Sequence, residues 1–280
     1  MKKILITGAN SYIGTSFEKY MAQWPDQYQV DTVDMIDGTW RNMSFAGYDA
    51  IYHVAGIAHI KETEENAQLY YRVNRDLAVA LAEKAKKDGV GHFVFMSSMS
   101  VYGMDRGVIT PDTLPSPKSH YGKSKLEAEQ AMAQLADETF RIAVLRPPMV
   151  YGKNCRGNFQ LMLKLAKKSP VFPVVSNQRS MISIETLCAF VRLILDGKET
   201  GVFFPQNREY VNTTEMVKIM AKALNRRVIF SRLAGAAVGT MVHFVGVARK
   251  AFSTLIYRDC EKHNFCYCNE SFEESVGKSI

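Results

Sequence analysis

The stretch ILITGANSYIG, residues 4–14, decides how the first part of the chain folds. Its apolar start predicts a buried strand, and a helical pattern begins at Tyr12. Gly8 permits a tight turn between the two, and Gly14 lets the helix pack closely on the strand. The helix N-terminus then presents unpaired N–H groups and a partial positive charge, which suit a pyrophosphate. We therefore predict a dinucleotide-binding turn made by Gly8, Asn10, Ser11, Tyr12, Ile13 and Gly14.

An acidic residue follows this turn at the spacing of a ribose ligand. Asp34 closes the second predicted strand, about twenty residues past the turn. A carboxylate there accepts hydrogen bonds from both ribose hydroxyls and repels a 2′-phosphate, which favours NAD. Asp31 and Asp37 are competing candidates, and Asp34 could instead be a solvated strand-end residue. Arg41 could serve a 2′-phosphate, so NADP stays open beside NAD.

Short apolar runs alternate with helical patterns through the first half of the chain. The predicted strands are Lys3–Thr7, Tyr28–Asp34, Asp49–Val54, His92–Ser97 and Arg141–Leu145, and the predicted helices are Tyr12–Gln23, Glu65–Lys87 and Ser124–Leu135. Several strands are apolar throughout, as strands covered on both faces must be. This alternation predicts an α/β fold of right-handed βαβ units, a Rossmann-type doubly wound parallel sheet.

The pattern changes after Arg146. Shorter helices are expected at Phe159–Lys167, Ile184–Leu195 and Thr214–Leu224, the last with Thr213 as its N-cap. We expect residues 1–146 to form a dinucleotide-binding domain that carries the catalytic groups. Residues 147–280 should form mainly a smaller C-terminal substrate-binding region. The boundary is soft, and a later strand or helix could return to the main sheet.

A tyrosine and a lysine stand four residues apart where a predicted helix begins. This spacing puts Tyr121 and Lys125 on one helical face. An ammonium near a phenol brings the phenol's pKa down toward neutrality, which makes it a usable acid and base. The serine-rich strand end at residues 97–100 can supply a hydroxyl to the same oxygen. Together with the glycine turn, this spacing predicts proton transfer beside a bound nicotinamide.

The composition restricts the partners and the location that we expect for the protein. Lys and Arg exceed Asp and Glu by 7, but they are spread along the chain, which argues against a nucleic-acid footprint. The apolar run Ile4–Thr7 is too short for a signal peptide, so we expect a cytoplasmic protein. No run of about 20 apolar residues predicts a spanning helix. The nearest approach, Leu233–Ala248, is expected to be a packed helical region, with membrane-surface contact as the lesser alternative.

The cysteines predict neither disulfides nor a metal site. In a reducing cytoplasm, the five cysteines should be free thiols. Cys266 and Cys268 are too closely spaced for a usual zinc pair and have no second pair to complete four ligands.

Four motifs appear together in an order that points to one family. They are the turn Thr7–Gly14, the strand end Ser97–Gly103, the pair Tyr121–Lys125 and the segment Arg146–Gly152, which reads RPPMVYG. With these motifs the chain resembles the extended short-chain dehydrogenase/reductases, the NAD-dependent epimerase/dehydratase family, to about Leu195. It is similar to bacterial nucleotide-sugar 4-epimerases and 4-keto-reductases of surface-polysaccharide pathways.

The resemblance assigns roles by position. It implies that Ser98 is the catalytic serine, with Ser97 and Ser100 as competitors, that Tyr121 is the acid/base, and that Lys125 is its partner and a nicotinamide-ribose ligand. It also implies cofactor contacts at Ala55, Gly56, Asn74 and Pro148, and a substrate diphosphate held by Asn158 and Arg179. The family tends to dimerise through two helices, here Glu65–Lys87 and Ser124–Leu135, so a homodimer is expected.

Departures from the family pattern restrict the chemistry. Ser11 stands where the middle glycine of the turn is usual, and the acidic pair that usually flanks adenine is not evident. Met99-Ser100 stands where sugar 4,6-dehydratases carry Asp-Glu, so water elimination lacks an acid and a base. The resemblance therefore implies oxidoreduction at C4 of a nucleotide-linked sugar, by an epimerase or a 4-ketoreductase. The alternative is a non-catalytic NAD(P)-binding sensor on the same fold.

Overall fold

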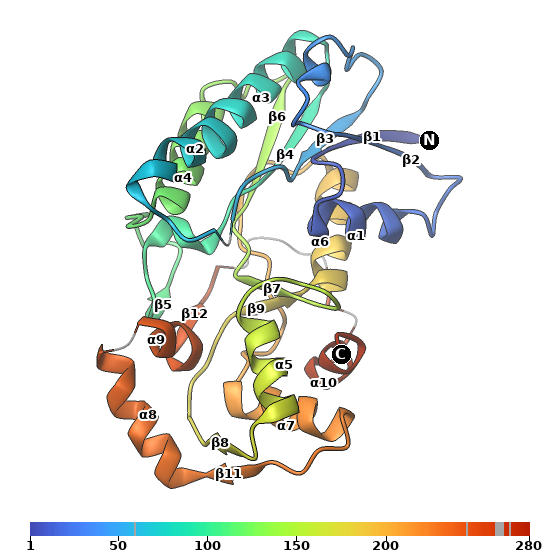
Figure 1. Cartoon of the computed structure of the whole chain (residues 1–280). Coiled ribbons are helices and arrows are strands. Elements are labelled where there is room, and N and C mark those ends of the chain that lie inside the picture. Colours follow the sequence, from blue (N-terminus) through green and yellow to red (C-terminus); the bar gives the residue numbers. More distant parts are fainter. Residues whose placement is uncertain (59, 245, 261–265, 269) are drawn as a thin grey trace.

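Six parallel strands form the central sheet of the computed structural model, which describes residues 1–58, 60–244, 246–260, 266–268 and 270–280 (Figure 1). The strand order is β10-β6-β4-β3-β1-β2. The strands are β1 (Lys2–Thr7), β2 (Tyr28–Val33), β3 (Ala50–His53), β4 (His92–Met96), β6 (Arg141–Leu145) and β10 (Gly201–Phe203). The order runs outward from β1 in both directions, so the sheet is doubly wound, as predicted.

Helices cover both faces of this sheet. Figure 1 shows α1 (Tyr12–Met21) and α6 (Ile184–Gly197) on one side, and α2 (Ala67–Tyr71), α3 (Leu77–Lys87) and α4 (His120–Ala133) on the other. Side chains alternate along each strand, so Ile4 and Ile6 pack into the α6 core while Leu5 packs into the α3 core. All three are fully buried, and burial of each such side chain stabilises the fold by about 1.5–3 kcal/mol.

The second half of the chain contributes to both parts of the molecule. β10 and α6 return to the main sheet, whereas the rest builds a smaller region below it (Figure 1). That region contains three two-stranded parallel pairs: β7 (Met149–Tyr151) with β9 (Met181–Ser183), β8 (Val171–Pro173) with β11 (Ile229–Ser231), and β5 (Gly107–Ile109) with β12 (Leu255–Tyr257). Its helices are α5 (Asn158–Lys168), α7 (Thr213–Ala223), α8 (Arg232–Phe244), α9 (Gly246–Phe252) and α10 (Phe272–Lys278).

Three local expectations need correction. Thr213 is not the N-cap of α7, because the side chain of Asn212 accepts from the Glu215 N–H and Thr213 is already helical. The helix expected at Glu65–Lys87 is not one regular α-helix. It runs through a short turn at Glu64–Asn66, α2, a π-helical turn at Arg72–Asp76 and then α3. The region Leu233–Ala248 is divided between α8 and α9.

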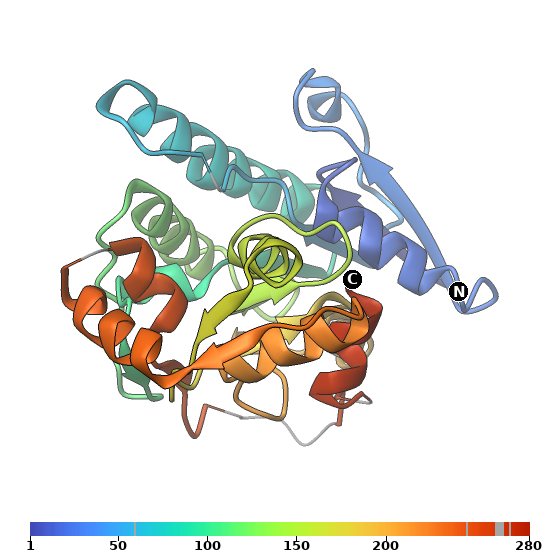
Figure 2. The ribbon, with the colours of Figure 1, turned by 60° about the horizontal axis from the view of Figure 1, so that its bottom comes forward.

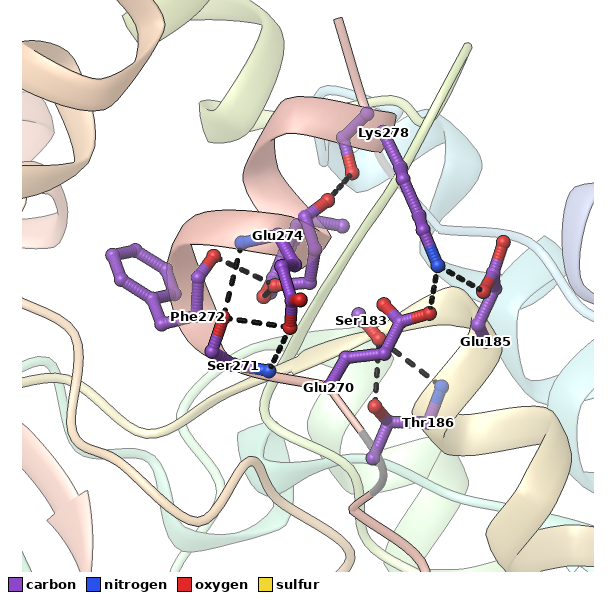
Figure 3. Close-up of polar contacts among 11 residues, drawn as sticks. Ser183, Glu185, Thr186, Glu270, Ser271, Phe272, Glu274 and Lys278 are labelled. Carbon is purple, nitrogen blue, oxygen red and sulfur yellow. Dashed lines mark hydrogen bonds and ion pairs between the residues drawn. The ribbon is translucent and has the colours of Figure 1, made fainter.

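The last helix is fastened to the start of α6 by charged side chains (Figure 3). Ser271 and Glu274 form a capping box at the start of α10. The Lys278 ammonium lies 3.7 Å from a carboxylate oxygen of Glu185 and forms a second ion pair with Glu270. The two carboxyl groups also face each other, and their hydrogen bond raises the pKa of Glu185. Lys278 therefore bridges two acids that would otherwise repel.

Candidate active site

The end of β1 approaches the end of β3 so closely that glycine is required between them. Gly8 has a φ of 118°, and a Cβ there would lie 2.8 Å from the backbone nitrogen of Ala55. The N–H of Ala55 in turn donates to the Thr7 carbonyl at 2.9 Å. The predicted cofactor turn and the Ala55-Gly56 segment are therefore neighbours at the carboxyl edge of the sheet.

The start of α1 leaves backbone donors without acceptors. Ser11 is the N-cap, and its hydroxyl accepts from the Gly14 N–H at 3.1 Å. Its φ of −72° suits any L-residue, which explains why serine can stand where glycine is usual. Within the described chain, the backbone N–H groups of Tyr12 and Ile13 have no acceptor. These free donors, with the positive end of the helix dipole, fit a pyrophosphate.

The three acidic candidates lie in β2 and in the loop that follows it. Asp34 accepts with one oxygen from the backbone N–H of Ile36 at 2.9 Å, and its second oxygen has no partner among the described residues. Asp31 accepts with one oxygen from two neighbouring side chains, and Asp37 accepts with one oxygen from the backbone N–H and the hydroxyl of Thr39. Each of the three acids therefore keeps one oxygen without a partner among the described residues, and Asp34 stands out only by its position directly after β2. Arg41 lies in the same loop and stacks its guanidinium over an indole.

Ser98 and Tyr121 come together where β4 ends and α4 begins. Ser98 caps the short helical turn Met99–Tyr102, and Tyr121 lies in the first turn of α4. Burial raises the pKa of the Tyr121 phenol, and a hydrogen bond from the Ser98 hydroxyl offsets part of that rise. The sequence expectation that the phenol's pKa falls toward neutrality is therefore wrong for this structure, since burial outweighs the hydroxyl.

Lys125 is buried beside the cofactor segment. Its side chain is almost inaccessible, and its ammonium donates to the Met96 carbonyl at 2.8 Å and lies 4.6 Å from the ring centre of Phe95. A Cβ on Gly56 would lie 3.3 Å from the same nitrogen. Burial lowers the pKa of Lys125 to about 7. The group can therefore exist with or without its proton near neutral pH.

Asn74 holds the loop that follows β3. Its carbonyl oxygen accepts from the Ile57 N–H at 2.9 Å, and its amide donates to the Ile57 carbonyl at 3.1 Å and to the Ser124 hydroxyl at 3.2 Å. Asn74 is fully buried and lies in the π-helical turn. Such turns are frequent at functional sites because they redirect a side chain. Asn74 thereby joins the predicted cofactor segment to the helix that carries Lys125.

The two competing serines have other partners. Ser97 is buried and donates to the carboxylate of Glu129, which pairs with Arg146. Ser100 donates its backbone N–H to the Ser98 hydroxyl at 3.1 Å. Ser98 is therefore the serine of this strand end that reaches the phenol.

The predicted substrate residues lie in the smaller region. Pro148 is buried just before β7, and the parallel pairing of Met149 with Met181 places Arg179 near the same end of the neighbouring strand. The Arg179 guanidinium donates to the Ser253 carbonyl at 2.8 Å. Asn158 is the first residue of α5. Among the described residues, neither Asn158 nor Arg179 forms a hydrogen bond with Ser98, Tyr121 or Lys125.

Two acidic residues of the site have no sequence signal that singles them out. Glu62 accepts from the backbone N–H groups of His120 and Tyr121, at 2.9 and 3.0 Å, and so holds the first turn of α4. Glu129 lies one helical turn past Lys125, and its charge raises the lysine's pKa against the effect of burial. Neither residue belongs to a recognisable motif, because each acts through a distant partner.

The described part of the chain contains no cluster of three metal-binding side chains. Its five cysteines form no disulfide. None of the helices described is long and apolar enough to span a bilayer.

Comparisons with known proteins agree with this geometry. The structure is similar to that of a dTDP-4-dehydrorhamnose reductase from Clostridium acetobutylicum, with a TM-score of 0.77 and 21% identity over 99% of this chain and 98% of that one. The sequence is 29% identical to a UDP-glucose 4-epimerase of Vibrio cholerae, over 80% of this chain and 76% of the relative. It is 24% identical to the N-acetyl-α-D-glucosaminyl-diphospho-ditrans,octacis-undecaprenol 4-epimerase of Escherichia coli O157:H7, over 80% and 73%.

The family itself follows from a match that covers most of the chain. The model of the NAD dependent epimerase/dehydratase family matches residues 4–229, which include the glycine turn, the Ser98 strand end and the Tyr121–Lys125 helix. This match confirms the predicted family, its Rossmann-type fold and its NAD(P)-type cofactor. The chain belongs to the NAD-dependent epimerase/dehydratase family of nucleotide-sugar epimerases and reductases.

Proposed function

We propose that this protein is an NAD-dependent enzyme that oxidises and reduces C4 of a nucleotide-linked sugar, and that it acts as a 4-epimerase. The observation that carries the proposal is the hydrogen bond between the Ser98 hydroxyl and the Tyr121 phenol, one helical turn before the buried Lys125. The relatives from V. cholerae and E. coli are both named as 4-epimerases, which supports C4 as the reacting carbon, and a further relative is named as a GDP-6-deoxy-D-mannose reductase. Nucleotide-linked sugars are precursors of surface polysaccharides, so we place the enzyme in the synthesis of such sugars.

The residues of the chain divide the work as follows. Tyr121 takes the proton of the C4 hydroxyl as the sugar is oxidised and returns it when the C4 carbonyl is reduced. Ser98 donates its one hydroxyl proton to the reacting oxygen and can accept from the neutral phenol. Lys125 stabilises the deprotonated phenol by its charge. Bound NAD supplies the chemistry that side chains lack, because it accepts a hydride from the sugar carbon and can give it back.

The cofactor would lie along the carboxyl edge of the sheet. The free N–H groups of Tyr12 and Ile13 would hold its pyrophosphate, and the unpaired oxygen of Asp34 would accept from a ribose hydroxyl. Gly56 and Asn74 lie where the nicotinamide ribose would meet Lys125. This arrangement supports NAD over NADP, since Asp34 would repel a 2′-phosphate.

The substrate's diphosphate would be held in the smaller region. The guanidinium of Arg179 donates one hydrogen bond to the Ser253 carbonyl, which leaves its other donors for a ligand. Asn158 would add a side-chain amide. Arginine suits the task because its donors bind phosphate oxygens in pairs. A diphosphate is also present in the polyprenyl-linked sugar named for the E. coli relative, so that substrate is the second candidate.

Turnover of the purified protein tests the proposal. With UDP-glucose or UDP-N-acetylglucosamine, we expect C4 epimers without net consumption of NADH, and NAD released on denaturation. Tyr121→Phe should reduce the rate by about 10²–10⁴-fold, the range that a positioned acid/base contributes. Tyr28→Phe is the matched control, because its hydroxyl bonds to Asp196 at the opposite edge of the sheet. A Tyr121→Phe enzyme as active as wild type would exclude Tyr121 as the acid/base, whereas a wild-type protein that binds NAD without any turnover would favour the non-catalytic alternative.

A 4-ketoreductase is the second candidate function. It would consume exchangeable NADH or NADPH with each turnover, and Arg41, in the same loop as Asp34, is the feature that favours NADPH. Stoichiometric oxidation of added NADPH with a 4-keto sugar nucleotide, and no interconversion of epimers, would replace the epimerase proposal by this one.

A further inference from the structure

Helix α8 has one face packed on the protein and the opposite face uncovered. Gly235 faces inward, where a Cβ would lie 2.1 Å from the Val174 carbonyl oxygen. At about 100° per residue, Leu233, Ala237 and Met241 lie in one stripe on the opposite side. Leu233 is 86% exposed and Met241 49% exposed. The helix therefore presents large apolar side chains to the surroundings, outside every core cluster of the molecule.

The uncovered face has no charge. The exposed positions Leu233, Ala236, Ala237, Thr240 and Met241 are apolar or carry a single hydroxyl. Ile229, three residues before the helix, is 68% exposed and extends the apolar surface. Figures 1 and 2 both show α8 at the outer edge of the smaller region, away from the six-stranded sheet. Nothing else in the described structure covers this face.

The segment of sequence that contains this face is rich in Lys and Arg and has no Asp or Glu. Residues 216–258 contain eight Lys or Arg and no Asp or Glu, whereas the whole chain carries a net charge of +7. Lys218 pairs with Glu215 one turn earlier on α7, and Lys222 pairs with Glu273 of α10. Among the described residues, no acid pairs with the exposed side chains of Arg226, Arg227 or Arg232. The sequence segment that carries the apolar face therefore has an excess of positive charge.

We propose that α8 and its flanking arginines form a peripheral membrane-binding face, with Leu233 and Met241 inserted among the lipids of an anionic bilayer. A helix with an uncharged apolar face and cations beside it is the pattern of an interfacial helix. Nucleic acid would require the cations on the contacting face, whereas here they flank it. Anionic lipid headgroups supply the charge that the segment itself lacks.

Binding to lipid vesicles tests this face without any turnover, so it stands or fails independently of the proposed function. The wild-type chain should float with phosphatidylglycerol-rich vesicles far more than with phosphatidylcholine vesicles, and added salt should release it. Leu233→Ser/Met241→Ser should abolish flotation. Arg226→Gln/Arg227→Gln/Arg232→Gln should lower the partition coefficient by about 100-fold, since each cation near the surface contributes about fivefold.

A triple variant on another helix is the matched control. Lys164→Gln/Lys167→Gln/Lys168→Gln removes the same charge from exposed positions of α5 and should change flotation by less than about fivefold. Circular dichroism melting shows whether each variant is folded. The proposal is wrong if wild type does not bind anionic vesicles, or if the α5 variant weakens binding as much as the α8 variants. It is also wrong if Leu233→Ser/Met241→Ser instead turns a dimer into a monomer, because a second copy would then cover the face.

Discussion

A buried ion pair behind the catalytic groups offers the sharpest test of the structure. Arg146 donates through Nη2 to Glu129 at 2.5 Å and through Nε at 3.1 Å. Its other nitrogen donates to the Tyr102 hydroxyl at 2.8 Å, and Ser97 also donates to Glu129. The side chains of Arg146 and Glu129 are only 10% and 6% exposed. Arginine keeps its proton at any relevant pH, so without Glu129 the protein would contain a buried positive charge with no ion-pair partner.

Glu129→Gln removes the charge and keeps the shape. Breaking a buried pair by removal of one partner costs about 3–5 kcal/mol, because the remaining charge stays desolvated. Against a total stability of about 5–15 kcal/mol, this is a large loss. Urea unfolding followed by circular dichroism should show a lower midpoint with an unchanged slope, since the same surface is exposed on unfolding.

The control lies two residues earlier on the same helix. Glu127 pairs with Arg75 at 2.6 Å, but the two side chains are 41% and 36% exposed. Glu127→Gln should cost less than about 1 kcal/mol, the usual value for a solvent-screened pair. If Glu129→Gln cost no more than Glu127→Gln, the reasoning from burial would be refuted.

Four further outcomes follow from the site. The pKa of Lys125 is about 7 in the folded chain and 10.5 ordinarily, so between these values the unfolded chain binds the extra proton. The contribution of this group to the free energy of unfolding should therefore rise with pH above about 7. Urea unfolding at neutral and alkaline pH should show a smaller rise for Lys125→Met than for wild type. An equal rise in both proteins would contradict the burial of Lys125. Asn74→Ala should cost about 2 kcal/mol and weaken NAD binding in calorimetry, whereas an unaltered Kd would exclude the anchoring role. Glu62→Gln should lower kcat several-fold at unchanged cofactor affinity, since an amide offers one acceptor for two N–H groups. A change in cofactor affinity without a change in kcat would refute the role of Glu62 in positioning Tyr121. Sedimentation should give a dimer paired through α3 and α4, and a monomer at micromolar concentration would reject it.

Five strands of the main sheet could be predicted because most of them are continuous apolar runs, whereas the three-residue strand β10 was not predicted. The strand Arg141–Leu145 has the predicted bounds, and the other four expected strands differ by only one or two residues. Strands of three residues such as β5 and β12 could not be predicted, because each depends on a partner far away in the chain. The N-cap of α7 was misplaced by one position because Asn212 and Thr213 are both good capping residues.

The candidate site was predictable in its motifs and unpredictable in its electrostatics. Spacing placed Tyr121 and Lys125 on one face, but burial of both groups, which sets their pKa values, depends on the folded surroundings. Ser97 and Ser98 alternate in direction at the strand end, so one meets Glu129 and the other the phenol. Choosing between them from the sequence required the family pattern. The π-helical turn at Asn74 has no local signal at all.

The pairing of β12 with β5 bears on the order in which the protein assembles. Leu255 aligns with Gly107, a few residues past the Ser98 strand end, and the Tyr257 hydroxyl donates to the Arg146 carbonyl at 2.8 Å. Contacts between segments so distant along the chain form late, because a long loop must close first. During synthesis, the six-stranded sheet can therefore fold before β12 pairs with β5. The Ser98 strand end gains the neighbouring β5–β12 pair only when residues 255–257 have emerged.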